Sequence, residues 1–399
     1  MGWPAAGQLW TFRKLAEPRL TAELARLSGA TIIGTAHCVS FQPCPNPEEA
    51  SQDRYVVQEW HVGGRTWRFA AIFDGHAGHE MADHAMIHLP ALLQKALQAS
   101  LEGWGDTTEP GTISHIMSRS ISEFDEEATS DILKMFPGGE EELSKLTDQE
   151  ISDIINTEEN SPKVVRCMRG TTVLVSLIDP LGRDFWVASL GDCQAALGTQ
   201  QRSGRWDTSI LSSNHNGIDP AEAQRIRNEH PGEPEIMLRD RVLGCIAVTR
   251  ALGDHLFKLP RIYTERVFFN SKVLFRARAA IPEVLPRIVT PPYLSSRADV
   301  RHVRLSPPSS DDGYKPEQVL IMCSDGLVDL YSDRNSLDES ARHWMKAVEY
   351  REVDAESNLA LRLLRDALGG DDETLVSRMI TVEMTERWMD DTTIIVQKL

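Results

Sequence analysis

Two kinds of hydrophobic pattern alternate along this chain. Short apolar runs bounded by turn residues are typical of buried strands, and they lie at 67–73, 171–178, 185–190, 317–323 and 392–396. Apolar residues at helical spacing lie at 8–28, 81–98, 124–136, 143–155, 219–229 and 336–369. Several predicted strands follow one another through short turns, which is how antiparallel neighbours are joined. The pattern therefore predicts an α+β fold built around antiparallel sheets.

Two segments interrupt the predicted strands. Residues 104–163 are acidic and poor in strand formers, and their spacing predicts two surface helices with solvated acidic faces. Residues 255–318 hold two Pro-Pro pairs, so we expect part of this stretch to be a surface excursion. We predict a helical lead-in over 1–30, kinked near Pro18, followed by a single domain over 31–399 that carries insertions near these two segments.

Composition excludes several classes of protein. The chain has 399 residues, with 42 basic and 59 acidic side chains, for a formal net charge of −17. This balance argues against a nucleic-acid partner, because neutralising phosphates requires a surplus of Lys and Arg. No apolar run approaches the roughly 18 residues that a membrane span needs, so we expect no membrane partner. The six cysteines are scattered without a Cys-x-x-Cys pair, which predicts reduced thiols rather than a disulfide framework or a zinc site.

Aspartates recur where predicted strands end or begin, at Asp74, Asp192, Asp325 and Asp390. Taken singly, an aspartate beside a glycine more often closes a turn. Four acids in similar places, with His76 close to the first, favour one shared site instead. Clustered carboxylates repel one another unless a divalent cation binds them. Oxygen ligands alone suit Mg²⁺ or Mn²⁺ rather than zinc, so the pattern predicts a metal site without naming its reaction.

Six ordered motifs carry a resemblance to a known family. They are Phe73-Asp74-Gly75-His76-Ala77-Gly78, Arg169-Gly170-Thr171-Thr172, Leu190-Gly191-Asp192, Val248-Thr249-Arg250-Ala251-Leu252-Gly253-Asp254, Cys323-Ser324-Asp325-Gly326 and Asp390-Asp391-Thr392-Thr393. In this order they resemble the motifs of the metal-dependent Ser/Thr protein phosphatases (the PPM, or type 2C, family). Three connecting segments, 213–216, 225–233 and 290–294, are similar to the branch of that family that includes pyruvate dehydrogenase phosphatase.

The resemblance implies a fold and a set of metal ligands. The fold would be a central antiparallel β-sandwich flanked by helices, in four α-β-β-α layers. Asp74 would bridge two Mg²⁺ or Mn²⁺ ions, and the Gly75 carbonyl would bind one of them. Asp325 and Asp390 would hold the other ion. Asp192 resembles the position that helps to form a weaker third metal site.

The resemblance also implies a reaction. It is the hydrolysis of phosphoserine and phosphothreonine in a phosphoprotein substrate by direct attack of a metal-bound hydroxide. Two neighbouring ions lower the pKa of a water between them and neutralise the charge that develops on the phosphate. His76 would be the general acid that protonates the leaving oxygen, a role that suits imidazole because its pKa lies near neutrality. Asp74 and His76 are therefore the expected catalytic residues.

The sequence departs from the family at two positions. Gln52 stands where the family usually has a glutamate ligand, so the site loses a negative charge and should bind Mg²⁺ or Mn²⁺ more weakly. Asp53 beside it is a candidate ligand that compensates, directly or through water. Glu48 stands, by ungapped counting, where many members carry an arginine for the substrate phosphate. Arg54 is the candidate substitute, although an exposed arginine is usually only a solvated side chain.

These departures leave three functions open. The first is an active phosphoprotein phosphatase, which the retained aspartates and His76 favour. The second is a pseudophosphatase that keeps the fold as a phosphoprotein-binding or scaffold module. The third is a metal-dependent hydrolase of small phosphate esters. The sequence indicates neither the physiological substrate nor the oligomeric state.

The N-terminal residues bear on the compartment. The first 30 residues lack the apolar centre of a secretory signal, and they include acidic residues, which mitochondrial presequences generally avoid. We therefore expect an intracellular protein and place it in the cytoplasm. The mitochondrion is the alternative that the branch resemblance suggests.

Overall fold

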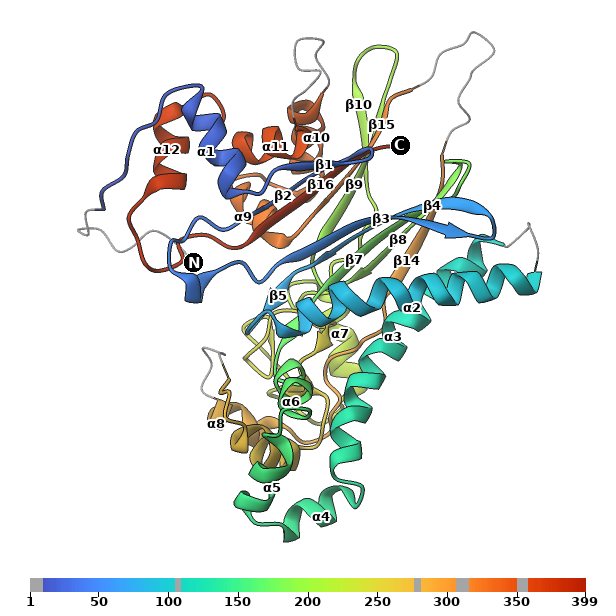
Figure 1. The fold of residues 1–399 in the computed structure, drawn as a ribbon, viewed down its shortest axis with the longest axis vertical. Helices are drawn as coiled ribbons and strands as arrows, with labels where there is room; N and C mark the ends of the chain where they lie inside the picture. Colours follow the sequence, from blue (N-terminus) through green and yellow to red (C-terminus); the bar gives the residue numbers. More distant parts are fainter. Residues whose placement is uncertain (1–9, 105–108, 276–280, 306–315, 350–357) are drawn as a thin grey trace.

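Two antiparallel sheets stacked face to face form the centre of the protein (Figure 1). The computed structural model describes residues 10–104, 109–275, 281–305, 316–349 and 358–399. In spatial order, one sheet has β1 (Thr31–Ile33), β2 (Ala36–Phe41), β16 (Thr392–Lys398), β15 (Gln318–Cys323), β9 (Gln194–Gln200) and β10 (Trp206–Ile210). The other has β14 (Asp299–Arg304), β8 (Asp184–Leu190), β7 (Val173–Ile178), β4 (Arg65–Phe73) and β3 (Arg54–Val62). Neighbouring strands run antiparallel in both sheets.

Alternation along the central strands divides their side chains between two cores. In β4, Ala70 and Ile72 pack between the two sheets, whereas Phe69 and Phe73 pack on the opposite face against helices. Strand β15 alternates in the same way, with Leu320 between the sheets. A strand buried on both faces reads as a continuous apolar run, which is why the sequence pattern located these strands.

Helices cover the outer face of each sheet. The long helices α2 (Glu80–Trp104) and α3 (Pro110–Met135) pack on the five-stranded sheet, as Figure 1 shows. The six-stranded sheet is covered by α1 (Arg19–Leu27), α9 (Asp325–Leu330), α10 (Leu337–Val348), α11 (Leu359–Leu368) and α12 (Glu373–Thr381). The predicted α+β fold with a central antiparallel β-sandwich flanked by helices is confirmed. Among the described residues, no helix combines the length and the apolar character that crossing a membrane requires.

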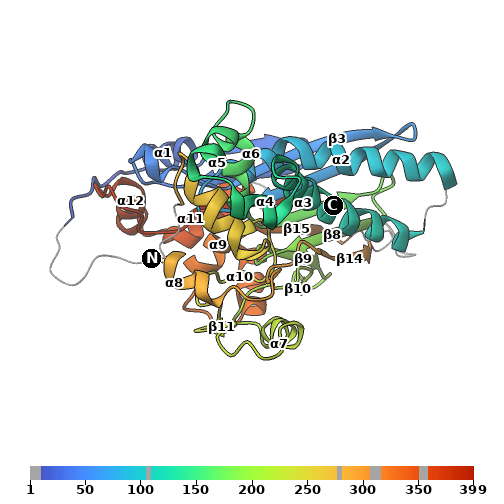
Figure 2. The same cartoon turned by 90° about the horizontal axis from the view of Figure 1, so that it is seen from below.

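Shorter elements gather at one end of the sandwich, in the lower part of Figure 1. A three-stranded sheet joins β13 (Leu252–Gly253), β6 (Gly170–Thr171) and β5 (Gly75–His76), and a hairpin joins β11 (Met237–Leu238) and β12 (Arg241–Val242). The α-helices here are α4 (Gly139–Lys145), α5 (Asp148–Ile155), α6 (Ser161–Cys167), α7 (Pro220–Glu229) and α8 (Ile281–Val284). Single helical turns are Pro47–Glu49, His255–Phe257, Tyr263–Val267, Phe268–Asn270 and Leu285–Arg287. Seen from below in Figure 2, α5 and α6 lie on one side of this end, and α7 and β11 lie on the other.

The N-terminal helix is shorter than the sequence pattern predicted. It begins at Arg19, directly after Pro18, because a proline is tolerated at a helix start but not in its interior. The preceding residues from position 10 are not helical and run beside α12. The backbone N–H groups of Arg13 and Leu15 donate hydrogen bonds to hydroxyls of that helix, so the segment is held by tertiary contacts that its own sequence does not reveal.

The two interrupting segments also differ from expectation. The predicted helix over 143–155 is divided between α4 and α5, because Thr147 caps a new helix and forms a capping box with Glu150. Helix α3 starts at Pro110, well before the predicted start, and its acidic face is not wholly solvated, because Asp125 is buried. Within 255–318, β14 is an edge strand of the sandwich, so the expected surface excursion applies only to the rest of this stretch.

Candidate active site

Three aspartates predicted from strand ends meet at one edge of the sandwich. Asp74 follows β4, Asp192 follows β8, and Asp325 begins α9 directly after β15. Each offers a carboxylate oxygen, and these atoms all lie within 4.8 Å of one another. Because β4 and β8 belong to one sheet and β15 to the other, the cluster forms where the ends of the two sheets converge.

The electrostatics of this cluster favour a bound cation. Burial, and next the charge of Asp325, raise the pKa of Asp74 well above its usual range. Burial, and next the charge of Asp192, do the same to the pKa of Asp325. Burial also raises the pKa of Asp192, although a hydrogen bond from Asn216 opposes that rise. Carboxylates this close cannot all be ionised at neutral pH without a compensating positive charge.

Asp53 is a further buried acid beside the cluster. Its residue is 3% exposed, and neither carboxylate oxygen has a hydrogen-bond partner among the described residues. Burial, and next the charge of Asp391, raise the pKa of Asp53 to about 7, although the nearby hydroxyls of Ser324 and Thr393 act to lower it. A buried carboxylate without donors is costly, whereas a divalent cation would satisfy it directly or through a water. The donor set, all oxygen, therefore fits Mg²⁺ or Mn²⁺.

His76 is paired with an aspartate to which the sequence analysis assigned no role. Its Nε2 lies 2.6 Å from the Asp254 carboxylate, and an ionised carboxylate only accepts, so Nε2 carries the proton. Burial acts to lower the pKa of His76, but the adjacent Asp254 outweighs burial, and the pKa is raised. The available signal was the Gly253-Asp254 pair, the same Gly-Asp step that precedes β9 at Asp192.

A glycine makes this close approach possible. A Cβ atom on Gly170 would lie 2.0 Å from His76 Nε2 and 2.2 Å from an Asp254 oxygen. Gly170 belongs to β6, which pairs with both β5 and β13 and so brings His76 and Asp254 together. The glycine of the Arg-Gly-Thr-Thr motif is therefore required because no side chain fits between His76 and Asp254.

A cavity of about 880 Å³ opens over these groups. Its walls include most of the predicted site residues, namely Asp74, Gly75, His76, Asp192, Asp325 and Asp390. One wall is apolar and comes from Met168, Leu256, Phe257 and Phe275. The acidic part of the lining suits cations, and the apolar part can contact an apolar portion of a ligand.

Gln52 lines the cavity but has other partners. Its side-chain Oε1 accepts a hydrogen bond of 2.8 Å from the Gly78 backbone N–H, and its backbone N–H donates to the Asp391 carboxylate at 2.8 Å. Gln52 therefore ties the start of β3 to the turn before α2. A Cβ atom on Gly75 would lie 2.5 Å from the Gln52 carbonyl oxygen, so this packing also requires glycine at position 75.

The cavity is lined by Arg241 and Arg387 and not by the expected arginine, Arg54. Arg54 is absent from the cavity lining, and its guanidinium binds Asp83 at 2.5 Å and nearby backbone carbonyls. Arg387 does line the cavity. Its side chain is 8% exposed, and it lies 3.2 Å from the Glu49 carboxylate and 3.3 Å from that of Asp391. Sequence reasoning missed Arg387 because no pattern surrounds it.

Comparison with known sequences places the chain among relatives of described activity. A sequence profile described as Protein phosphatase 2C matches residues 48–368. The chain is 24% identical to a protein phosphatase 2C homologue of Schizosaccharomyces pombe over 383 residues, 89% of this chain and 79% of that protein. It is 29% identical over 265 residues, 57% of its length, to the mitochondrial pyruvate dehydrogenase (acetyl-transferring) phosphatase 2 of Homo sapiens. The match covers 47% of that enzyme, so the chain spans about half the length of such relatives.

Two solved structures share the fold. A serine-threonine phosphatase 2C from Toxoplasma gondii superposes with a TM-score of 0.54 at 15% identity, over 92% of this chain and 96% of that one. A C. elegans sex determining protein superposes with a TM-score of 0.54 at 16% identity, over 91% of this chain and 64% of that one. At such identities the likeness establishes the arrangement of the sandwich and its helices, and no more.

Proposed function

Because the chain belongs to the protein phosphatase 2C family, we propose that it hydrolyses phosphoserine and phosphothreonine in proteins with the help of Mg²⁺ or Mn²⁺. The observation that carries this proposal is the cluster of three aspartates within 4.8 Å, next to the unpartnered carboxylate of Asp53. A module that only binds phosphoproteins has no need for such a concentration of buried acid, which costs stability unless a cation is bound.

The proposed metal ligands are Asp74, Asp192, Asp325 and Asp390, with the Gly75 carbonyl, and with Asp53 directly or through water. Bound ions would supply Lewis-acid chemistry, activating a water and neutralising charge on the phosphate, as a hydroxide mechanism requires. The number of ions that we propose is two, with a weaker third near Asp192. Asp192 is a suitable candidate because the Asn216 amide donates only one hydrogen bond to it, at 2.7 Å, which leaves further oxygen lone pairs.

His76 is the proposed general acid. As the P–O bond to the serine or threonine oxygen breaks, that oxygen takes a proton from the imidazole, and water supplies the new oxygen on phosphorus. Asp254 supports this role by favouring the protonated imidazole. Without Asp254, burial would lower the pKa of His76 against only the smaller effect of Asp192, which favours the neutral ring.

Arg387 is the proposed contact for the substrate phosphate, in preference to Arg54. It reaches the cavity from the segment before β16, close to Asp390 and Asp391, where a phosphate held by cations would lie. A guanidinium recognises phosphate oxygens through paired hydrogen bonds. Arg387 is held near this place by the Glu49 and Asp391 carboxylates and by the backbone carbonyls of Glu49 and Ala50, and the phosphate would replace the Glu49 carboxylate.

A second candidate function rests on Gln52. Its amide oxygen already accepts a hydrogen bond from Gly78, and it brings no negative charge, so the position offers the ions less than a glutamate would. That favours a pseudophosphatase in which the cavity binds a phosphoprotein without turnover. The third possibility, hydrolysis of small phosphate esters, differs from the first only in what fills the apolar wall.

Phosphate release from a phosphothreonine peptide, with millimolar Mn²⁺ and then with excess chelator, tests the proposal. We expect turnover that needs Mn²⁺, that Asp325→Asn abolishes and that Asp338→Asn, an exposed change on α10 outside the cavity lining, retains. Mn²⁺ binding in calorimetry without turnover would establish the pseudophosphatase instead. Faster turnover of free phosphomonoesters than of the peptide would establish the third function. Absence of Mn²⁺ binding in folded protein would refute the metal site itself.

The compartment is proposed separately. The relatives with pyruvate dehydrogenase phosphatase names are described as mitochondrial, but those of Homo sapiens and Bos taurus are only 29% and 26% identical to this chain. We propose the cytoplasm. Imaging of the full chain with a C-terminal fluorescent tag tests this proposal. Co-localisation with a mitochondrial marker would overturn it.

A further inference from the structure

The loop that carries Asp254 has a demanding backbone. Asp254 adopts a left-handed conformation with φ of 54°, and the preceding Gly253 has φ of 77°. A non-glycine residue rarely adopts this conformation, and it persists only where the surroundings enforce it. The Asp254 N–H donates to the Arg169 carbonyl at 2.8 Å, which fixes one side of the loop. Further contacts that hold the loop come from helix α3.

Helix α3 supplies that hold through Asp125. One carboxylate oxygen accepts a hydrogen bond of 2.7 Å from the backbone N–H of Gly253, the residue next to Asp254. The other oxygen accepts from Lys258 Nζ at 2.6 Å. Lys258 also donates to the Ala251 carbonyl at 2.8 Å, so a single ion pair clamps both ends of the loop onto the helix.

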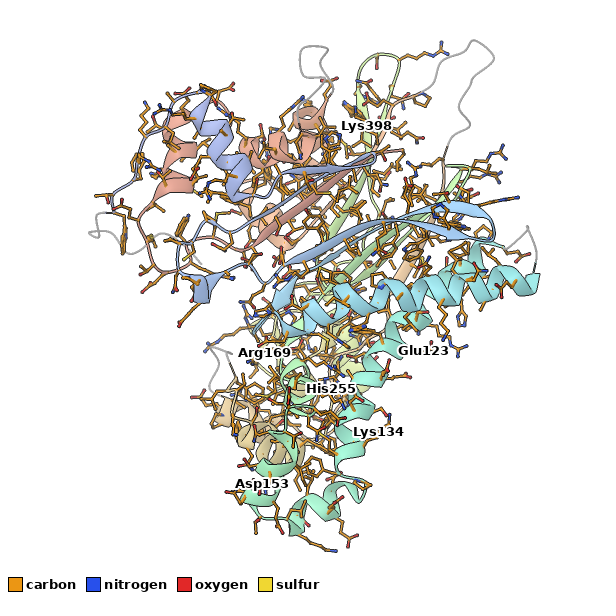
Figure 3. All side chains as sticks on the ribbon, in the orientation of Figure 1. Glu123, Lys134, Asp153, Arg169, His255 and Lys398 are labelled. Carbon is orange, nitrogen blue, oxygen red and sulfur yellow. The ribbon has the colours of Figure 1, made fainter. Side chains whose placement is uncertain are left out.

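A second link lies one helical turn further along α3. Thr129 Oγ1 lies 2.8 Å from His255 Nε2, and His255 directly follows Asp254. Figure 3 shows His255 beside this helix, below the sandwich. Residues four apart share one helix face, so Asp125 and Thr129 form one contact surface for the loop.

The ion pair between Asp125 and Lys258 fixes the geometry of the Asp254 loop more than it stabilises the folded protein. The side chains of Asp125 and Lys258 are 5% and 7% exposed. A buried pair contributes little net stability over apolar residues of the same shape, but it fixes the geometry of whatever it binds. Here the bound groups are the backbone atoms on either side of Asp254.

We propose that Asp125 and Lys258 are positioning residues that hold Asp254 against His76 and thereby make His76 an effective proton donor to the leaving oxygen. The inference rests on the proposed function, in which His76 protonates that oxygen. It assigns a role to α3, a helix that the sequence pattern suggested was a solvated surface element. Neither residue touches the substrate, and each acts through the loop between them.

A comparison of two leaving groups tests this role. Threonine oxygen must be protonated as it leaves, whereas the phenolate of p-nitrophenyl phosphate leaves without protonation. We expect Asp125→Asn to lower kcat on a phosphothreonine peptide about tenfold and kcat on p-nitrophenyl phosphate less than about twofold. The matched control is Asp131→Asn, which breaks another ion pair of α3, with Arg166, and removes no contact to this loop. That variant should leave the ratio of the two rates unchanged.

Additional readouts separate positioning from mere folding and do not need turnover. In Asp125→Asn, the low-field ¹H NMR signal of the His76 Nε2 proton, assigned by its loss in His76→Gln, should shift or vanish. In a His76→Gln background, Asp125→Asn should cause no further loss of kcat on the phosphothreonine peptide, because both changes remove the same proton donation. Equal loss on both substrates with an unchanged NMR signal would overturn the proposal.

The two proposals fail in different ways. If the unaltered chain hydrolyses neither substrate, the proposed function fails, and the NMR signal still tests whether Asp125 positions His76. If Asp125→Asn does not fold, as judged by near-ultraviolet circular dichroism, Thr129→Val takes its place, because it leaves no buried charge unpaired. Thr129→Val should produce a smaller, leaving-group-selective loss. No selectivity in that variant would also refute the positioning role.

Discussion

At the scale of single residues, space and hydrogen bonds decide what the motif positions can do. The strand-end aspartates were predictable because Asp beside Gly after an apolar run is visible in the sequence itself. Gln52 was equally visible, but its engagement with Gly78 was not, because that contact is fixed by the turn before α2. Arg387 gave no signal at all, since its partner Glu49 lies on a distant segment of the chain.

The charge at position 52 can be restored. We expect Gln52→Glu to lower the Mn²⁺ concentration that gives half-maximal rate by about threefold or more, because a carboxylate keeps the hydrogen bond from Gly78 and adds a hard anionic ligand. The measurement is the rate, and separately the calorimetric affinity, across a Mn²⁺ titration. Gln58→Glu adds the same charge within β3, outside the cavity lining, and serves as control. An unchanged metal requirement would mean that Gln52 does not face the ions.

The two arginines give contrasting expectations. We expect Arg387→Gln to raise KM for the phosphothreonine peptide about tenfold, the usual loss when one charged hydrogen-bond partner of a phosphate is removed. Arg54→Gln should change KM less than about twofold, because Arg54 is bound to Asp83 outside the cavity. Calorimetric Mn²⁺ affinity is measured alongside, and it should not fall when a cation is removed beside an acidic site. A larger effect at Arg54 would reverse the assignment.

At the scale of elements, the local hydrophobic pattern of the sequence predicted the strands, but it did not predict which elements contact one another. Strand β4 was predictable because it is apolar on both faces, and α7 because Asp219 caps it. The hold of α3 on the Asp254 loop was not, because Asp125 and Gly253 are separated by 128 positions. The hydrophobic periodicity of either segment carries no information about a contact between these two residues.

Helix α7 provides a pH-dependent test of such a contact. Its Glu222 is paired with Arg250 at 2.6 Å and with Arg225 at 2.9 Å. Burial acts to raise the pKa of Glu222, but hydrogen bonds from Arg250 and Arg225 outweigh it and hold the pKa at about 2. A lowered folded-state pKa contributes stability above the unfolded value of 4.5, and that stability is lost as pH falls toward 2.

We therefore expect Glu222→Gln to lower the free energy of unfolding by about 2 kcal/mol at pH 7, after allowance for solvent screening. The difference between the two proteins should shrink between about pH 4.5 and 2. Urea unfolding at several pH values measures it. Glu229→Gln, on the exposed side of the same helix, is the control and should cost much less. A difference that stays constant with pH would show that Glu222 acts through packing alone.

At the scale of the whole molecule, the acid cluster joins the two sheets. Asp74 ends a strand of the five-stranded sheet, and Asp325 follows a strand of the six-stranded sheet. Without a cation their mutual repulsion opposes the convergence of the sheets at this edge, whereas a shared cation draws them together. The resemblance to a known family anticipated this arrangement, because the layers and the order of the motifs are properties of the whole fold.

Metal should therefore stabilise the entire sandwich and not only the site. A ligand that binds only the folded state at about 100 times its Kd adds about 2.7 kcal/mol to stability. We expect the thermal midpoint of the full chain to rise by several degrees with saturating Mn²⁺ and to return with chelator. Asp325→Asn should be more stable than the unaltered chain without metal, because it relieves repulsion, yet gain little from Mn²⁺. Asp338→Asn, an exposed change on α10, should respond to Mn²⁺ as the unaltered chain does. If Mn²⁺ raised the midpoint equally in all three proteins, the stabilising ion would lie elsewhere, and the cluster would not be the place where the two sheets share a cation.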